Sequence, residues 1–512
     1  MAKEVKGFRY IYQAGLFLIA LLVFPYVFNA KLDLNGDNCY FYINATSLAS
    51  GNGYCDMFGE PTANFPPGYP LLMAPLRAVT SSFVAQKILN LLFLFGGVIL
   101  LFSVLVREGV RRELSFIAAA AVLVTPHLLE FSTMMMSEAS CFFFIALAFW
   151  SFLRIPTEQG ASPWRSGYLY LFLFAVFYSL LIRTQAVVLF LAFSAGLLMI
   201  RRRKLALALV AATPICYIPW MIRNMVLGLG QSRYLDQVSF SFVGSKLKML
   251  LVQALPESVV PCFKVDYMQS PSILLWAIAI VMLLLIAYGV WQLRRLRPIM
   301  YLFLAGGVGI VAIMDSPSLY RYLIILLPFF TAALVVGLWC ICSSLWLMVS
   351  RKSLLPWFMS AVLLPGLLQG GGCMFRHSLS DIHEYASGDY PPLFRNSFVM
   401  ASQAIGMDRD AVVASRKPEL LYLVEGLKGV PLINAADDTV AVRYLLECDV
   451  DYLIVDGTVP GDNIMKLING NRELFTVKSY ILEPDLFLFR FEKENAAAWL
   501  LGQGTQSPKP SR

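Results

Sequence analysis

The sequence of 512 residues is poor in charge, since Asp, Glu, Lys and Arg make up only 14% of it, whereas soluble globular proteins carry about 25%. Histidine occurs only three times, and the nine cysteines show none of the close spacings that typify a zinc site. No GxGxxG or P-loop pattern is found, so the sequence gives no sign of a nucleotide site. This composition excludes an ordinary soluble domain, and also the disordered, collagen-like and disulfide-scaffold classes.

What the sequence has instead is hydrophobic residues, at 58%, and aromatic residues, at 13%, with a mean hydropathy of +0.66. Such a composition over this length fits a chain that uses lipid as the solvent for most of its surface. The net charge of +8 arises in the apolar part, residues 1–375, and not in a basic patch that would bind nucleic acid. We therefore expect a membrane protein with no nucleic-acid partner.

Long apolar runs predict a polytopic α-helical membrane protein with about eleven transmembrane helices. We interpret the first run, 8–30, as an uncleaved anchor rather than a signal peptide, because it lacks a convincing small-x-small cleavage site and further spans follow. The other runs lie at 84–106, 114–129, 138–154, 168–183, 186–200, 205–226, 271–293, 298–314, 321–349 and 353–375. The stretch from 168 to 200 could be one long helix, but Arg183, Thr184 and Gln185 indicate a break.

The charges of the short loops predict the orientation of these spans, because Lys and Arg are retained on the cytoplasmic side. With a cytoplasmic N-terminus, every cytoplasmic loop is basic. The basic residues in question are Arg107, Arg111, Arg112, Arg154, Arg165, Arg201 to Lys204, Arg294, Arg295, Arg297, Arg351 and Lys352. An odd number of spans then places the chain after residue 375 on the periplasmic or extracellular side of the cell (inner) membrane.

Three outward segments, 31–83, 228–270 and 376–512, are too long to be simple turns, and long ordered segments of this kind often carry function. The last of them changes composition, with strand-like runs such as DYLIVDG between helical stretches such as TVAVRYLLE. The predicted domains follow from these boundaries. They are a transmembrane module at 1–375, whose first outward loop is 31–83, a small extracytoplasmic α/β domain at 376–493, and a disordered tail at 494–512.

The first outward loop contains two aspartates close to the end of the first span. From Asp37 the pattern becomes helical, and Gly51 and Gly53 end the helix. A carboxylate at the start of a helix is stabilised in its ionised form by the helix dipole, so Asp37 could serve as a base at the membrane surface. It could equally well only cap the helix. Asp33, directly after the span, has the weaker case, since an aspartate there is usually just solvated.

A series of motifs stands in a definite order over most of residues 8–330. The motifs are Asp37 with Tyr40, Ala45, Leu48, Gly51 and Gly53, then FPPGYPLL at 65–72, Glu138 in MMMSEAS, LIRTQ at 181–185, PWMIRN at 219–224 and YRYLIILLPF at 320–329. This series resembles the GT-C superfamily, the multi-spanning glycosyltransferases that use polyprenyl-phosphate-linked sugars. It is most similar to bacterial relatives of protein mannosyltransferases and to the aminoarabinose transferases acting on lipid A.

The resemblance implies roles for particular residues. It implies that Asp37 is the catalytic base, and that a second acidic residue lines the site, Glu138 in preference to Glu130. Apart from the resemblance, we assign Asp33 and Tyr40 to the substrate pocket, and the PPG turn would direct Tyr69 or Arg77 into the same pocket. The reaction would be an inverting transfer from a polyprenyl-phosphate sugar to a hydroxyl of a glycan, lipid or protein acceptor. No cofactor is implied with certainty, although Asp37 and Glu138 could hold a divalent cation such as Mg²⁺ or Mn²⁺.

The positions of three arginines support the same interpretation on physical grounds. Arg183, Arg223 and Arg321 fall at the outward ends of predicted spans, against the positive-inside trend. An arginine within a span costs about 2.5 to 3.5 kcal/mol near the bilayer centre and tends to find a partner. The three could form a site for the donor phosphate, because guanidinium groups match phosphate oxygens in pairs. The alternative is that each one reaches the lipid headgroups.

Two other functions fit a polytopic chain. A transporter or lipid flippase usually places ionisable groups near the membrane midplane, often in paired repeats, whereas the acids and arginines here are expected at one membrane face. An assembly protein would leave the pattern from Asp37 to Tyr69 unexplained. Cys39 and Cys55 share the first outward loop and could form a disulfide in an oxidising compartment, and the sequence leaves this open.

Overall fold

The computed structural model describes residues 10–156, 163–229, 238–260, 265, 267, 269–315, 319–349, 379–457 and 463–504. The chain divides into two compact units. Unit 1 comprises Met1–Asp33, Leu48–Ser50 and Pro61–Ser387, and unit 2 comprises Leu34–Ser47, Gly51–Glu60 and Gly388–Arg512. Most of the segment between residues 34 and 60 therefore groups with the C-terminal part of the chain.

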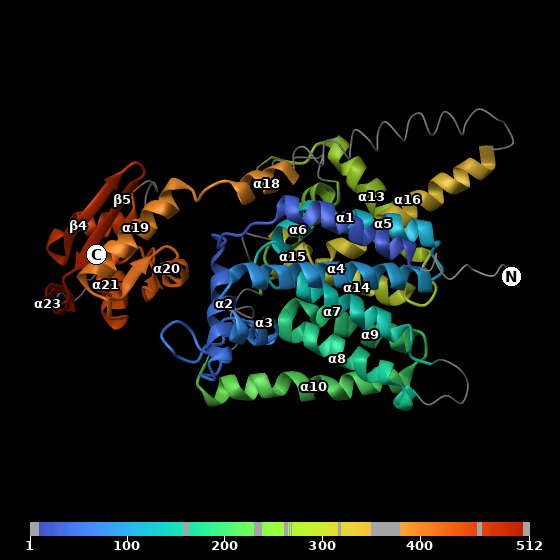
Figure 1. Ribbon diagram of the computed structural model, residues 1–512, viewed down its shortest axis with the longest axis horizontal. Helices are drawn as coiled ribbons and strands as arrows, with labels where there is room; N and C mark the ends of the chain where they lie inside the picture. The colour runs from blue at the N-terminus through green and yellow to red at the C-terminus, as the bar shows by residue number, and fades with distance from the viewer. Residues whose placement is uncertain are drawn as a thin grey trace, which may run out of the picture. The chain divides into compact units, whose positions relative to one another are not determined.

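Unit 1 is helical, and its long helices run alongside one another in a bundle (Figure 1). Its helices are α1 (Ile11–Val27), α3 (Gly68–Val79), α4 (Phe83–Arg107), α5 (Arg112–Leu123), α6 (Pro126–Ser132), α7 (Glu138–Phe152), α8 (Gly167–Ile182), α9 (Val187–Met199), α10 (Arg203–Val226), α11 (Val243–Lys248), α12 (Leu255–Val259), α13 (Ile273–Trp291), α14 (Arg297–Ile313), α15 (Leu319–Leu323), α16 (Leu327–Val349) and α18 (Ser380–Ser387).

Among the described residues, four helices are long and apolar enough to cross a membrane, namely α4, α10, α13 and α16, and the bent pair α5 and α6 would make a fifth span. Shorter apolar helices, including α1, α7, α8 and α14, occupy the other predicted runs up to residue 349. The predicted span at 353–375 lies outside the described residues. The chain is thus a helical membrane-type protein, and the count of about eleven spans stays a prediction.

Two of the predicted runs contain breaks with clear causes. The run at 114–129 is split into α5 and α6, which meet at an angle of 58°. Pro126 begins α6, and a proline disfavours a helical conformation in the residue before it, so α5 cannot continue through this point. The break expected at Arg183 is confirmed, because α8 ends at Ile182 and Arg183 has an extended backbone, with φ −144° and ψ 128°.

Small residues allow two of the membrane-type helices to pack closely. Gly289 of α13 faces α16, and a Cβ atom added to it would lie within 1.9 Å of the carbonyl oxygen of Ala333. A Cβ atom added to Gly337 of α16 would lie 2.0 Å from the carbonyl oxygen of Leu285. Helix pairs in lipid associate through such close packing, because the surrounding lipid provides no hydrophobic driving force between them.

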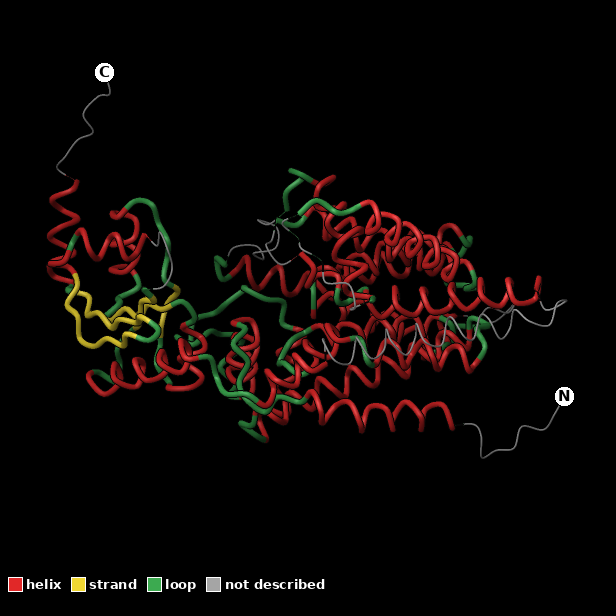
Figure 2. The backbone as a smooth tube through the Cα atoms, turned by 90° about the horizontal axis from the view of Figure 1, so that it is seen from above, coloured by secondary structure: helices red, strands yellow, loops and turns green. Residues whose placement is uncertain are grey.

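Unit 2 contains helix α2 (Gly36–Ala49) up to residue 47 and a five-stranded sheet. The strands are β1 (Val413–Ser415), β2 (Gly429–Pro431), β3 (Tyr452–Asp456), β4 (Phe475–Leu482) and β5 (Asp485–Phe491), in the order β2-β1-β3-β5-β4. Strand β1 pairs parallel to both β2 and β3, whereas β5 pairs antiparallel to β3 and β4. The strands are drawn in yellow in Figure 2.

Helices cover both faces of this sheet. Successive residues of a strand point to opposite faces, so neighbouring residues of β3 belong to two different cores. Leu453 and Val455 of β3 face one core, to which α21 (Asp438–Glu447), α22 (Asn463–Gly470) and α23 (Lys493–Gly504) contribute. Tyr452 and Ile454 face a second core with α19 (Pro392–Met407) and α20 (Pro418–Glu425). This part of the chain therefore has the alternating strand and helix order of an α/β domain.

The prediction of a disordered tail from residue 494 is wrong for its first part. Residues 493–504 form α23, in which Ala496 is fully buried and Trp499 and Leu500 pack against the core of the sheet. The segment is too short to form a core of its own, but its apolar side chains complete one that the sheet provides. Residues 505–512 lie outside the described residues.

Candidate functional site

Polar side chains of unit 1 gather where α1 and α8 end and where α4 and α7 begin. The central group is Glu138, the first residue of α7, whose side chain is completely buried. Its Oε1 atom lies 2.8 Å from Nη1 of Arg183 and accepts a hydrogen bond of 3.1 Å from Nε of Arg321. We call these three residues the Glu138 triad.

Both arginines of the triad are shielded from solvent, with side-chain exposures of 8% for Arg183 and 17% for Arg321. Nη1 of Arg183 also donates to Oγ of Ser137, at 3.0 Å. The other carboxylate oxygen of Glu138, Oε2, is buried and has no hydrogen-bond partner among the described residues. Two guanidinium groups sharing one carboxylate carry a net charge of +1, which makes the triad attractive to an anion.

The break after α8 explains how Arg183 reaches this position. In one continuous helix from α8 to α9, Arg183 would lie in the middle of a long apolar helix. The extended backbone of Arg183 and the short 3₁₀ turn Thr184–Ala186 interrupt the helix there instead. Gln185 accepts a hydrogen bond of 3.4 Å from Nε of Arg183, which restricts the guanidinium further.

Glu138 and Glu130 were both considered as the second acidic residue of the site, and their surroundings in the structure differ. The Glu130 side chain is 42% exposed and lies 3.8 Å from Nδ1 of His127, within the short helix α6. Glu138 is buried between two arginines, and a buried carboxylate needs such partners to remain ionised.

Tyr69 is also buried, and it connects the start of α3 to α4. Its hydroxyl donates to Oδ1 of Asn90, at 3.0 Å, and the amide of Asn90 donates to the carbonyl of Met136, at 2.9 Å. Asn90 therefore ties the turn after the PPG motif to the segment just before Glu138. The assignment of Tyr69 to the substrate pocket stays a prediction, but its contacts indicate a role in positioning Glu138.

Asp33 forms an ion pair that the sequence analysis did not anticipate. Its Oδ2 atom lies 2.7 Å from Nζ of Lys87, with side-chain exposures of 1% and 0%. Asn29 donates to Oδ1 of Asp33 at 2.7 Å, and Nζ of Lys87 also donates to the carbonyls of Asn29 and Lys31. The pair thus fixes the chain after α1 against the second turn of α4.

Arg223, near the end of α10, contacts the end of the first loop and two neighbouring residues of its own helix. Its Nη1 atom donates to the carbonyl of Thr62, at 3.0 Å, and to Oδ1 of Asn224, at 2.9 Å, and its guanidinium lies over the ring of Trp220. Arg223 therefore anchors the end of the first loop to α10.

Asp37 and Tyr40 lie on α2 in unit 2. The backbone N–H of Asp37 donates to Oδ1 of Asn35, at 3.2 Å, so that Asn35 supplies the cap and Asp37 lies in the first turn. Asp37 and the Glu138 triad belong to different units, and their convergence in one cavity stays a prediction.

The start of α2 packs against the start of α20. Nζ of Lys417 donates a hydrogen bond to the carbonyl of Leu34, and Glu419 occupies the space that a side chain at Gly36 would need. Burial raises the pKa of Glu419, and the nearby charge of Asp37 raises it further. Burial lowers the pKa of Lys417, while the carboxylates of Glu419 and Asp37 oppose that shift. The environment of Asp37 therefore includes two charged residues from a distant part of the sequence.

The cysteines of the first loop are separate in the structure. Cys39 and Cys55 are both buried thiols that form no disulfide with each other, and Sγ of Cys55 donates to the carbonyl of Asn52 at 3.2 Å. In the described part of the chain, no group of three or more His, Cys, Asp and Glu residues could hold a metal ion.

Sequence reasoning missed Lys87, Asn90, Lys417 and Glu419. The first two carry a signal that was present, because QKILN places polar residues at the outward end of an apolar run, just as Arg183 is placed. Lys417 and Glu419 gave no such signal, because charged residues are ordinary on the surface of an α/β domain.

Most of the chain shares its fold with the solved structures of ArnT and of an archaeal oligosaccharyltransferase, which confirms the fold that the resemblance implied. The crystal structure of ArnT from Cupriavidus metallidurans in the apo state matches with a TM-score of 0.60 and 12% identity, over 95% of this chain and 98% of that one. The same protein bound to undecaprenyl phosphate matches with a TM-score of 0.60 and 11% identity, over 94% and 98% of the two chains.

A second protein with this fold is the archaeal oligosaccharyltransferase AglB from Archaeoglobus fulgidus, solved with an inhibitory peptide and a dolichol-phosphate. It matches with a TM-score of 0.56 and 12% identity, over 88% of this chain and 70% of that one. No protein-family model matches the sequence, and no curated protein matches it. At identities this low the likeness establishes the fold.

Proposed function

We propose that the protein is an integral membrane glycosyltransferase that moves a sugar from a polyprenyl-phosphate donor to an acceptor hydroxyl. The observation that carries this proposal is the Glu138 triad, a buried group with a net positive charge at the end of a membrane-type helix bundle. A lipid-linked phosphate is an anion that can reach such a site from the surrounding membrane. Structures of this fold with undecaprenyl phosphate and with dolichol-phosphate support the choice.

The arginines of the triad would act on the leaving group. As the bond between the anomeric carbon and the phosphate oxygen breaks, negative charge grows on the phosphate, and Arg183 and Arg321 stabilise it. The guanidinium groups are held in place by Glu138 before the donor binds, so little reorganisation is needed during the reaction. Glu138 would thereby orient the arginines, and its second oxygen could contact the incoming acceptor.

Asp37 would act on the other side of the reaction. We assign it the role of general base, which accepts the proton of the acceptor hydroxyl as that oxygen attacks the anomeric carbon. Its place in the first turn of α2 puts its carboxylate near the positive end of the helix dipole. A single displacement with no enzymic nucleophile inverts the anomeric configuration. The reaction would belong to the hexosyl- and pentosyltransferases, on the extracytoplasmic side of the cell membrane.

The remaining predicted pocket residues divide into two groups. Asp33 and Tyr69 are buried and engaged with Lys87 and Asn90, so we assign them positioning roles. Tyr40 stays assigned to the substrate pocket, and Arg223 to the donor phosphate. Dependence of the transfer on a divalent cation stays a prediction, which the effect of a chelator on turnover tests.

A transfer assay tests the proposal. Purified protein in nanodiscs would be mixed with a panel of radiolabelled polyprenyl-phosphate sugars and with glycan, lipid and protein acceptors. Glu138→Gln is expected to lower turnover by about 10²- to 10³-fold, because it removes the charge that holds the two arginines in place for the transition state. Glu130→Gln, a matched change at the more exposed carboxylate, should leave turnover unchanged.

The outcome that contradicts the proposal is a folded wild-type protein that consumes none of the donors. If the same protein moved labelled lipid between the leaflets of a vesicle, the transporter or flippase interpretation would replace it.

A further inference from the structure

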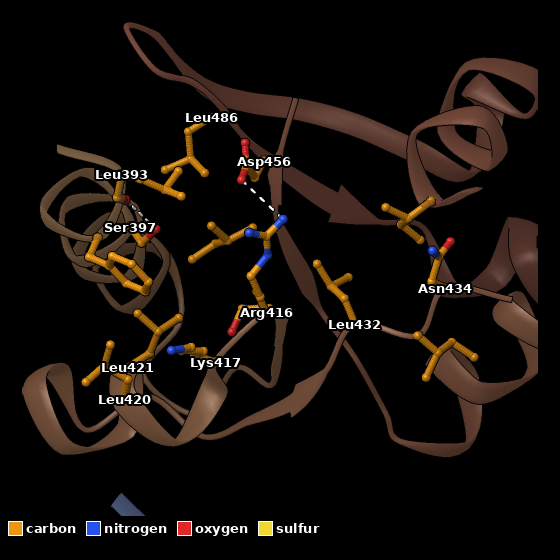
Figure 3. Close-up of a pocket in the computed structure, with 15 residues that line it drawn as sticks. Leu393, Ser397, Arg416, Lys417, Leu420, Leu421, Leu432, Asn434, Asp456 and Leu486 are labelled. Carbon is orange, nitrogen blue, oxygen red and sulfur yellow. Dashed lines mark hydrogen bonds and ion pairs between the residues drawn. The ribbon is translucent and has the colours of Figure 1, made fainter. Parts of the chain in front are cut away.

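The α/β domain of unit 2 has a cavity of about 240 Å³ at the carboxyl ends of its parallel strands (Figure 3). After β1, the chain passes through α20 to β2 on one side, and then through α21 to β3 on the other side. After β3, the chain passes through α22 to β4 at the opposite edge from β2, so the connections leave β1 and β3 in opposite directions. In open α/β sheets, ligands bind in the crevice that forms at such a point.

Several polar groups of the cavity come from the carboxyl ends of β1 and β3. Arg416 follows β1 and Asp456 ends β3, and Nη2 of Arg416 lies 3.3 Å from Oδ2 of Asp456, as the dashed line in Figure 3 shows. Asn434 uses its Oδ1 to accept from the backbone N–H of Asn463, at 3.0 Å, which directs its amide group as a donor.

Ser415, the last residue of β1, provides the observation that points to a ligand. It is only 3% exposed and lines the cavity, and its Oγ atom has no hydrogen-bond partner among the described residues. A buried hydroxyl without a partner costs about 1–3 kcal/mol, and buried polar groups are normally satisfied. A ligand that hydrogen-bonds to Ser415 would remove this cost.

The charges of the cavity favour a neutral ligand over an anion. The positive charge of Arg416 is opposed by Asp456, whose carboxylate is nearly buried at the cavity wall. Lys417, the other cation of the cavity, donates to the carbonyl of Leu34, and the nearby carboxylates of Glu419 and Asp37 offset its positive charge. The carboxylate of Asp456 would repel a phosphate, whereas a hydroxyl group can donate to Asp456 and accept from Arg416 at the same time.

Ser397 also lines the cavity, but its hydroxyl donates to the carbonyl of Leu393. The rest of the wall is apolar and limits the size of the ligand. Its side chains are Leu393, Phe394, Leu420, Leu421, Leu432, Ile433, Ile454, Ile464 and Leu486. The volume is below the roughly 300–1,000 Å³ of sites for drug-sized ligands. A small molecule with several hydroxyl groups on one edge and C–H groups on its face fits this combination.

We propose that this cavity binds one neutral sugar ring, with hydroxyl groups bridging Arg416 and Asp456 and a further hydroxyl bonded to Ser415. Under the proposed transferase function, the sugar would belong to a glycan acceptor. Binding itself does not depend on that function, because no catalytic residue lines the cavity.

The test uses the full-length protein in detergent micelles and saturation-transfer difference NMR with free neutral hexoses, pentoses and N-acetylhexosamines. At least one of them is expected to bind. Asp456→Asn and Ser415→Ala are each expected to weaken that binding about tenfold, equivalent to about 1.4 kcal/mol. Asp389→Asn removes a carboxylate from an exposed ion pair elsewhere in unit 2, 3.8 Å from Arg395, and should leave binding unchanged.

Three results would overturn the proposal. They are the absence of binding by every neutral sugar, binding that Ser415→Ala and Asp456→Asn leave intact, and displacement of the sugar by inorganic phosphate at equal concentration. Ser415→Ala removes one hydroxyl and keeps the domain testable if Asp456→Asn fails to fold. Glu138→Gln should bind the sugar as the wild type does, so a failure of the transferase proposal is recognised separately.

Discussion

The ammonium group of Lys87 lies 2.7 Å from Oδ2 of Asp33, and both side chains are removed from solvent. The charges of the pair satisfy each other, and Asn29 supplies a further hydrogen bond to Asp33. Removing one partner of a buried pair leaves an uncompensated charge, whereas replacing both with apolar residues of similar size is often tolerated. The pair therefore holds the chain after α1 in place without need of a catalytic role.

Lys87→Met should destabilise the protein strongly, by about 3–5 kcal/mol, because Asp33 would lose its buried counter-charge. The double variant Lys87→Met with Asp33→Leu should recover most of the loss. The measurement is the apparent Tm in detergent, followed by intrinsic fluorescence. A single variant as stable as the wild type, or a double variant less stable than the single one, would contradict the structural role of the pair.

Asp37→Asn should abolish transfer while the donor still binds, because the amide keeps the size of the side chain but cannot accept the proton. Single-turnover transfer and equilibrium binding of the donor lipid would be measured on the same preparation. Glu60→Gln, in the same loop and exposed, is the matched control and should transfer normally. Retained turnover in Asp37→Asn would remove Asp37 from the mechanism.

Stability should depend on pH through Glu419. Its pKa is raised by burial and by Asp37, so the folded protein holds this proton more tightly than the unfolded chain does. The contribution of Glu419 to stability is then greatest below its ordinary pKa of 4.5 and falls as the pH rises through the raised value.

Glu419→Gln should therefore gain apparent Tm relative to the wild type as the pH is increased from 4 to 7, since the neutral amide has no carboxylate to desolvate. Glu425→Gln, at the other end of α20, provides a control for the loss of a charge from this helix. A difference between Glu419→Gln and the wild type that stays constant across this range would show that the carboxylate is not desolvated.

Much of the fold of unit 1 could be predicted because hydrophobic length and basic loops are local properties of the sequence. The break at Arg183 was predicted from three polar residues within an apolar stretch, and the structure has it. The split at Pro126 was not predicted, although a proline in an apolar run is a recognised signal. The helix α23 was missed because its burial depends on a sheet formed by residues distant from it.

Only part of the candidate site could be predicted from the sequence. Topology placed Glu138, Arg183 and Arg321 at the same membrane face, but their sharing of one carboxylate oxygen depends on side-chain packing across three helical segments. The contact of Lys417 with Leu34 joins residues 383 positions apart. No pattern in a single sequence encodes a contact of this kind.

Equilibrium binding of a polyprenyl phosphate, free of sugar, tests the central claim most directly, because it requires neither the correct sugar nor the correct acceptor. Arg321→Gln is expected to weaken binding at least about tenfold. Arg111→Gln, which removes an exposed arginine paired only loosely with Glu113, should bind like the wild type. Equal affinity of Arg321→Gln and wild type for the lipid phosphate would contradict the account.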